Sequence, residues 1–122
     1  MNIKKLVKEV NRHMVHQIRA GDKHRFVDIS IVSVGDRLFV RQYKFSQRSW
    51  YHAFLKDSAG EIKFGEFDPI KIEGRIPQDL DEITRSVTKA YWKKYHIIYA
   101  IMRLSYSKKQ HEASTLELIP QL

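Results

Sequence analysis

The chain has 122 residues, of which 43% are hydrophobic and 11% aromatic, and this is enough material for a single domain with one core. It contains no cysteine, which excludes disulfides, thiolate metal sites and cysteine nucleophiles. The longest uncharged apolar stretch, residues 97–102, is too short to cross a bilayer, and the N-terminus lacks the apolar block of a secretory signal. We therefore expect one cytoplasmic domain over residues 1–122, with no membrane contact.

Positive charge is the unusual feature of the composition. The chain carries 22 Lys and Arg against 14 Asp and Glu, a net charge of +8 at pH 7, which attracts polyanions and phosphorylated ligands at long range. The basic residues occur in ones and twos, however, and this distribution is typical of a solvated surface. Nucleic acid is therefore the less favoured partner.

A short amphipathic helix is predicted over residues 3–10, where apolar residues recur at helical spacing. They are Ile3, Leu6, Val7 and Val10. The segment that follows is ambiguous, because its apolar residues continue a helical stripe while a strand ending in a Gly-Asp turn fits equally well. We favour a strand over about residues 14–19.

The clearest local structure is a β-hairpin. Apolar residues alternate over residues 25–34, the pair Gly35-Asp36 provides a turn, and a second strand follows from Arg37. Further strands are predicted at 50–55, where the aromatic residues Trp50, Tyr51 and Phe54 gather, at 61–65 after a turn at Gly60, and at 70–76. All five glycines have turn-like positions.

Beyond Pro77 the apolar period changes to that of a helix. The stripe consists of Leu80, Ile83, Val87, Ala90, Tyr91 and Tyr95. Acidic residues in its first turn and lysines in its last turn suit the helix dipole. With a helical piece at 97–104 and a last strand at 114–120, the sequence predicts an α+β fold: a barrel or curved sheet of about six mostly antiparallel strands with two or three flanking helices.

Catalytic and metal-binding signatures are weak. No nucleophile elbow or local triad motif is present, and the glycines have none of the spacings of a phosphate-binding loop. His13 and His16 could both reach a metal from one face of a helix, but no acidic third ligand lies near them in the sequence. We therefore expect no metal site.

The most suggestive cluster lies at residues 41–52, RQYKFSQRSWYH, where cations alternate with aromatic residues. The cations are Arg41, Lys44 and Arg48, and the aromatic residues are Tyr43, Phe45, Trp50 and Tyr51. Guanidinium groups bind phosphate oxygens and flat rings bury a heterocycle, so the cluster suits a phosphorylated ring compound. The alternative is that the aromatic side chains fill the core and the cations are solvated.

Five segments of the chain also carry a resemblance to a known family. They are GDRLFVRQY at 35–43, SWYHAF at 49–54, GEIKFG at 60–65, AYWKKY at 90–95 and STLELIP at 114–120. In this order, over about residues 25–120, they resemble the uncharacterised bacterial family catalogued as domain of unknown function 2255. The resemblance implies a split β-barrel of the flavin-reductase type, whose superfamily includes deazaflavin-dependent nitroreductases and pyridoxamine phosphate oxidases.

The resemblance also implies where a ligand would bind. In that superfamily a flavin-type ring lies against the barrel, and basic and hydroxyl side chains at strand ends hold its phosphate. This places contacts at Arg41, Lys44, Ser46, Arg48 and Trp50. Family members usually have a glycine in the loop after the Val-Arg pair, where this chain reads KFSQRS and lacks it.

The leading functional hypothesis is a protein that binds FMN or a deazaflavin and acts as a small oxidoreductase by two-electron reduction. The cofactor would carry the chemistry, so no catalytic side chain is required. Ring contacts are expected from Tyr43, Trp50 and Tyr51, and phosphate contacts from Arg41, Lys44 and Arg48. Because related proteins are often homodimers with the ligand at the interface, the resemblance also implies a homodimer.

Two alternatives stay open. The first is a non-enzymatic basic module that binds nucleic acid or a protein partner, for which a steep salt dependence of binding would be diagnostic. The second is a barrel that has lost its ancestral ligand and persists as a dimer.

Overall fold

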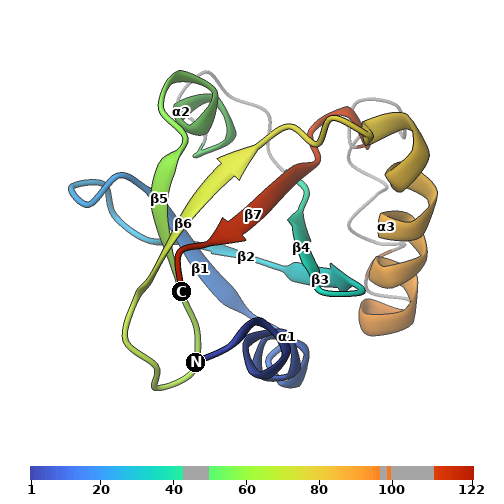
Figure 1. The fold of residues 1–122 in the computed structure, drawn as a ribbon, viewed down its shortest axis with the longest axis horizontal. Coiled ribbons are helices and arrows are strands. Elements are labelled where there is room, and N and C mark those ends of the chain that lie inside the picture. The colour runs from blue at the N-terminus through green and yellow to red at the C-terminus, as the bar shows by residue number, and fades with distance from the viewer. Residues whose placement is uncertain (43–49, 97–98, 100–111) are drawn as a thin grey trace.

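The computed structural model describes residues 1–42, 50–96, 99 and 112–122. Within these ranges, strands form a central sheet and three helices lie around it (Figure 1). The elements in chain order are α1 (Ile3–Arg12), β1 (His16–Ala20), β2 (Val27–Ile29), β3 (Ile31–Val34), β4 (Arg37–Val40), α2 (Trp50–Lys56), β5 (Ala59–Lys63), β6 (Ile70–Arg75), α3 (Leu80–Tyr95) and β7 (Leu116–Pro120).

The sheet is a nearly closed barrel. Its seven strands have the order β2-β1-β5-β6-β7-β4-β3, and every pair of neighbours is antiparallel. The two strands at the ends of this order, β2 and β3, are separated in the chain by Ser30 alone. The chain therefore passes directly from one edge of the sheet to the other. The architecture is an α+β split β-barrel, as the sequence predicted, with one strand more than the expected count.

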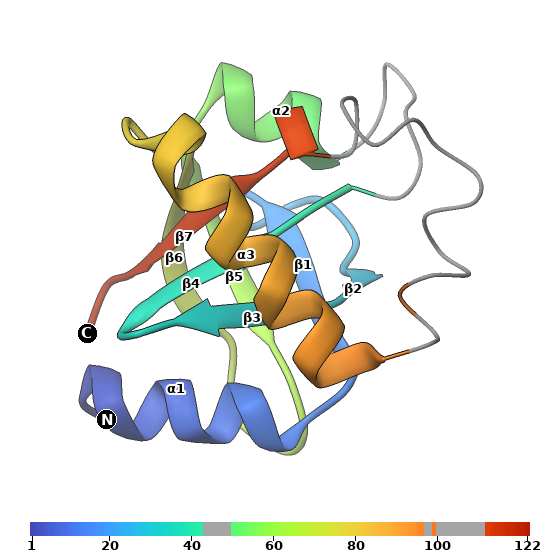
Figure 2. The ribbon, with the colours of Figure 1, turned by 90° about the vertical axis from the view of Figure 1, so that its right-hand side faces the viewer.

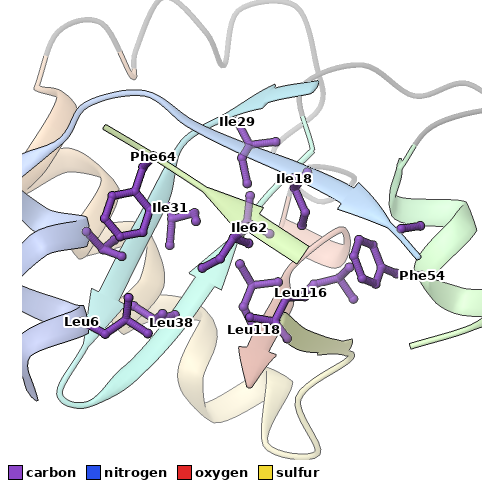
Figure 3. Close-up of a cluster of buried hydrophobic side chains, with 14 residues drawn as sticks. Leu6, Ile18, Ile29, Ile31, Leu38, Phe54, Ile62, Phe64, Leu116 and Leu118 are labelled. Atoms are coloured by element: carbon purple, nitrogen blue, oxygen red, sulfur yellow. The ribbon is translucent and has the colours of Figure 1, made fainter. Parts of the chain in front are cut away.

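The inside of the barrel is the main core. In β1, the inward side chains His16, Ile18 and Ala20 are buried and alternate with half-buried ones, the period of two that a strand imposes. Figure 3 shows how aliphatic and aromatic side chains from all round the barrel meet. The cluster includes Leu6, Ile18, Ile29, Ile31, Leu38, Phe54, Ile62, Phe64, Leu116 and Leu118.

A second core lies between α3 and the outer side of the β3–β4 hairpin (Figure 2). Neighbouring residues of β3 point to opposite sides, so Ile31 packs inside the barrel while Val32 packs beneath α3. Val87 and Tyr91 of α3 complete this layer. The hairpin is therefore buried on both faces, and its turn carries Gly35 with a φ of +60°, in the left-handed region that favours glycine.

The sequence predicted the ends of α1 and α3 well. The Asn2 side chain accepts a hydrogen bond from the Lys5 backbone N–H at 2.9 Å and begins α1, which buries Leu6 and Val10. Helix α3 spans Leu80–Tyr95 with acidic residues in its first turn and lysines in its last. The favoured strand after α1 is confirmed as β1, and the last strand as β7.

Three local predictions are wrong. Residues 50–56 form helix α2 rather than a strand, because Trp50 and Phe54, four residues apart, both face the barrel. The continuous strand expected before Gly35 is divided at Ser30 into β2 and β3, which pair with different neighbours. Gly60 lies in β5 and Gly74 in β6, not in turns. The helical piece predicted at 97–104 lies outside the described residues except for residue 99.

Candidate functional site

The structure describes three of the seven residues expected to contact a ligand. Arg41 follows directly after β4, whereas Trp50 and Tyr51 form the first turn of α2. The other four, Tyr43, Lys44, Ser46 and Arg48, lie outside the described residues. In the chain they connect the end of β4 to the start of α2, so both ends of the predicted cluster are fixed by described elements.

Arg41 is fully buried, and its guanidinium group binds protein oxygens. Nε donates to Thr115 Oγ1 at 2.8 Å, Nη1 donates to Thr88 Oγ1 at 2.8 Å and to the Tyr99 hydroxyl at 3.1 Å, and Nη2 donates to the Thr84 carbonyl at 3.0 Å. A buried charge needs such a set of partners to offset its lost hydration. In this structure Arg41 ties β4 to α3 and to the start of β7, and a contact between Arg41 and a ligand phosphate stays a prediction.

The hydroxyl group of Tyr91 completes the same network. It accepts a hydrogen bond from the Arg41 backbone N–H at 2.9 Å and donates to the Ser30 carbonyl at 2.6 Å. Its ring stacks on that of Tyr99, with centroids 4.9 Å apart. Helix α3 therefore holds both the end of β4 and the single residue through which the barrel closes.

Helix α2 is positioned by an aromatic ring that lies against two strand glycines. The Phe54 ring is buried over Gly60 of β5 and Gly74 of β6. A Cβ atom at Gly74 would lie 2.7 Å from Phe54 Cδ1, and one at Gly60 would also overlap the ring. Only glycine leaves room for this approach. Because Trp50 lies one turn before Phe54 and packs edge-on against it, the glycines also fix the Trp50 indole.

A cavity of about 300 Å³ opens beside Trp50. Its walls come from β1, from the loop between β1 and β2, from β2 and from α2. Val27 supplies apolar surface, since it is 40% exposed although its strand partner Ile18, which also borders the cavity, is buried. His24 and Arg25 stand on the loop side. An aromatic wall, an apolar floor and two basic side chains thus meet in one place.

The charges around this cavity are not equivalent. Arg19 also lines it, but its Nε donates to Glu61 Oε1 at 2.8 Å and its guanidinium lies over the Phe26 ring at 4.4 Å, so a carboxylate neutralises its charge. Arg25 and His24 are exposed, and among the described residues neither has an acidic partner. The Arg25 guanidinium and the His24 ring N–H are the donors that an anionic ligand could bind here.

A larger cavity of about 520 Å³ lies over β1, β5 and β6. Its lining mixes the carboxylates of Asp22, Glu61 and Glu73 with the cations Arg19 and Lys71. Such a mixture of signs does not suit a phosphate group. The smaller cavity beside Trp50 is therefore the better candidate for an anionic ring compound.

Tyr51 faces away from the cavity residues. Its hydroxyl donates to the Ala113 carbonyl at 3.3 Å, and burial raises its pKa. It anchors α2 to the segment before β7. Within the described ranges, no three His, Asp or Glu side chains gather in a way that could hold a metal ion. In the same ranges, no helix is both long and apolar enough to traverse a lipid bilayer.

Comparison with models of known protein families identifies the family of this chain. A family model described as an uncharacterized protein conserved in bacteria (DUF2255) matches residues 2–118. The chain belongs to the DUF2255 family. The resemblance seen in its sequence segments is thereby confirmed for nearly the whole length. A search of curated protein sequences found no match for this DUF2255 protein.

Solved structures share the fold of this DUF2255 protein at very low sequence identity. A putative pyridoxamine 5'-phosphate oxidase from Listeria innocua has a TM-score of 0.63 at 9% identity, covering 98% of this chain and 94% of that one. A conserved hypothetical protein from Mycobacterium tuberculosis has a TM-score of 0.58 at 11% identity, covering 100% of this chain and 80% of that one. A FAD-binding protein from Mesorhizobium loti has a TM-score of 0.54 at 8% identity, covering 98% of this chain and 88% of that one. These likenesses show the split-barrel fold.

Sequence reasoning missed His24 and Arg25. They follow the Gly-Asp turn after β1, some 25 residues before Trp50, so no single sequence window brings them together. The available signal was the pair of basic residues in the loop shortly before β2.

Proposed function

We propose that this DUF2255 protein binds a flavin-type cofactor, FMN or a deazaflavin, at the cavity beside Trp50 and acts as a small reductase. The observation that carries the proposal is that the Trp50 indole, the apolar Val27 and the donor side chains of Arg25 and His24 lie around one cavity. The structural neighbour from Mesorhizobium loti is a FAD-binding protein, and this supports the choice of ligand. When bound, the cofactor would supply two-electron reduction.

Each described side chain would have a distinct role. Trp50 would lie against the ring system, because indole is a large flat surface held in place by Phe54. Arg25 and His24 would bind phosphate oxygens through charge-assisted hydrogen bonds. Arg41 would act indirectly, by fixing the end of β4 from which the segment with Tyr43, Lys44, Ser46 and Arg48 leaves. Those four residues stay predicted contacts.

The size of the cavity beside Trp50 bears on whether the protein forms a homodimer. At about 300 Å³ it is at the lower limit of small-molecule sites, so it would enclose one end of an FMN-sized ligand. A homodimer would enclose the other end if the ligand lies at the interface. The dimer is part of the proposal, and light scattering with and without ligand tests it: a monomer in both states would contradict it.

The first experiment is an absorption spectrum and a mass spectrum of the denatured extract from protein purified at low salt, followed by titration with FMN and with a deazaflavin. We expect saturable binding of one of them. Replacing both donor side chains, His24→Gln with Arg25→Gln, should weaken binding at least about tenfold, the loss expected for a hydrogen bond to a charged group. Trp50→Leu should weaken it as well.

Lys56→Gln is the matched control, because it removes one exposed charge from the same helix as Trp50. Its binding should equal that of the parent protein. If neither FMN nor the deazaflavin binds, the proposal is overturned. Binding that the variants at 24, 25 and 50 leave unchanged would show that the cavity beside Trp50 is not the site.

A further inference from the structure

The outer face of α3 presents cations around an exposed tryptophan. Arg85, Lys89 and Lys93 are exposed at intervals of four residues, and Trp92 and His96 lie on the same side. This set of five residues is called the α3 stripe below. At a rise of about 1.5 Å per residue it extends over about 17 Å. It is separate from the cavity beside Trp50, which α2 and the strands β1 and β2 form.

The cations of the α3 stripe are available for binding. Among the described residues, no carboxylate forms an ion pair with Arg85, Lys89 or Lys93. The acidic residues of the helix are confined to its first turn, at Asp81 and Glu82. The remaining three turns therefore form a positive surface, consistent with the net charge of +8.

Trp92 gives this positive surface an aromatic platform. Tyr99 packs edge-on against it, with ring centroids 5.2 Å apart, and 39% of Trp92 remains exposed. Large aromatic side chains are usually buried, and here the inner face of α3 already supplies Val87, Tyr91 and Tyr95 to the core. An exposed indole among cations is the arrangement on which an unpaired base stacks while its phosphates bind Lys and Arg.

A polar hollow borders the stripe at Lys93. It has a volume of about 300 Å³ and is lined by residues of α1, β3 and α3. Asn11 and Ser33 stand at this hollow and bind each other, Asn11 Nδ2 donating to Ser33 Oγ at 2.9 Å. Both offer further donor and acceptor capacity to the edge of a base.

The hollow is preformed because Lys94 holds its walls together. The Lys94 ammonium donates to the Val10 carbonyl of α1 at 2.9 Å and to the Ile31 carbonyl of β3 at 3.0 Å. Its charge is thus bound to backbone oxygens, and it contributes positive potential rather than a free contact. Lys93 remains as the cation at the mouth.

We propose that the α3 stripe and the adjoining hollow bind single-stranded nucleic acid, with phosphates on Arg85, Lys89 and Lys93, a base stacked on Trp92 and a neighbouring base edge at Asn11 and Ser33. A duplex fits less well, because its bases are not free to stack on an indole. An anionic membrane also fits less well, since Trp92 is the one large apolar side chain on the stripe and interfacial helices bury a whole apolar face.

The test is fluorescence anisotropy with labelled single-stranded RNA and DNA of about 16 nucleotides, the upper range for one small domain. Three phosphate contacts predict a slope of about −2 for log K against log salt between about 50 and 200 mM. Lys89→Gln with Lys93→Gln should weaken binding on the order of tenfold and reduce the slope by about 1.4. Trp92→Leu should weaken binding at least about fivefold with the slope unchanged.

The matched control is Lys56→Gln with Lys71→Gln, which removes two exposed lysines from α2 and β6. The control should bind as the parent protein does. Equal losses in both double variants, no binding of single strands, or equal affinity for duplex would each overturn the proposal. Binding to vesicles of anionic lipid but not to oligonucleotides would overturn it in favour of a membrane surface. Titration of the Lys89→Gln with Lys93→Gln variant with flavin tests the cavity beside Trp50 independently. A failure of the nucleic-acid proposal can then be told apart from a failure of the flavin proposal.

Discussion

Helices α2 and α3 both pack on the barrel, but through opposite kinds of contact. Helix α2 packs through the Phe54 ring, which lies against the backbone of Gly60 and Gly74. Helix α3 adds hydroxyl groups that reach backbone carbonyls, with Tyr91 donating to Ser30 and Tyr95 donating to Met14, each at 2.6 Å. The apolar contact is set by shape, whereas the polar contacts require particular donors and acceptors.

We call the contacts of α3 the polar side of the barrel and those of α2 the apolar side. The polar side also includes the junction of α1 with the barrel. His16 is fully buried there: its Nδ1 accepts a hydrogen bond from the Ile31 N–H at 3.0 Å, and its Nε2 donates to the Val10 carbonyl at 2.9 Å. Lys94 donates to the Val10 and Ile31 carbonyls, and burial lowers its pKa to about 8. The two sides therefore respond to different changes. The stability of the α3 side depends on the protonation states of His16 and Lys94 and on complete hydrogen bonding, whereas that of the α2 side depends on the volume available to the Phe54 ring.

The largest effect is expected from Arg41→Met, on the polar side. The substitution keeps much of the side-chain volume but removes the donors to Thr84, Thr88, Thr115 and Tyr99. Buried acceptors left unpaired should lower the free energy of unfolding by about 3–4 kcal/mol. Urea unfolding measures this value. Arg85→Met, at an exposed position, should change it by less than about 0.5 kcal/mol, and a loss at Arg41 no larger than this would contradict the structural role.

A pH dependence should appear on the polar side through His16. Burial, the main cause, lowers the pKa of His16 from 6.5 to about 4, and the charges of Lys94 and His13 lower it further, while the hydrogen bond to Val10 acts in the opposite direction. In the unfolded chain the ring binds its proton near pH 6.5, so the stabilisation is complete above 6.5 and is lost as the pH falls towards about 4. The full loss is about 3 kcal/mol.

His16→Gln isolates this contribution, since glutamine retains a donor and an acceptor but does not titrate. Its stability should vary less with pH over the same window than that of the parent protein. Hydrogen exchange near the lower end of the window should show opening of α1 and α3 before α2. Equal slopes for parent and variant would rule out His16 as the source.

The smallest of the three effects is expected on the apolar side, from Gly74→Ala. The added Cβ would overlap the Phe54 ring, and overpacking of this kind costs about 2 kcal/mol. In a Phe54→Ala background the same change should be neutral or stabilising, because alanine is otherwise better than glycine within a strand. The double-mutant cycle measures this coupling in urea. Equal costs in both backgrounds would show that Phe54 does not limit the space at Gly74.

The elements that the sequence predicted correctly are those with a clear apolar period or a clear turn signal. Helix α3 and the β3–β4 turn follow from periodicity and from the Gly35-Asp36 pair. Helix α2 was mistaken for a strand because a run of aromatic residues is typical of strands, although the spacing of Trp50 and Phe54 is helical. The break at Ser30 carries no sequence signal, since alternation continues through it.

The site was less predictable than the fold, because its residues are brought together from distant parts of the chain. Arg41 and Trp50 share one sequence cluster, yet the burial of Arg41 depends on Thr84 and Thr115, 43 and 74 residues away. Trp50 meets Arg25 only through the packing of α2 on the strand glycines. Sequence could therefore nominate residue types for binding, but not which cations remain free.

The closure of the barrel at Ser30 also bears on how far the sheet edges are open to pairing with another chain. Edge strands expose unpaired backbone groups that can template pairing with another chain. Here both edges of the sheet, β2 and β3, are only three and four residues long and belong to one continuous stretch. The bond from Tyr91 to the Ser30 carbonyl holds that stretch in place. A proteolytic cut at Ser30 would release both edge strands at once and would convert the nearly closed barrel into an open, aggregation-prone sheet.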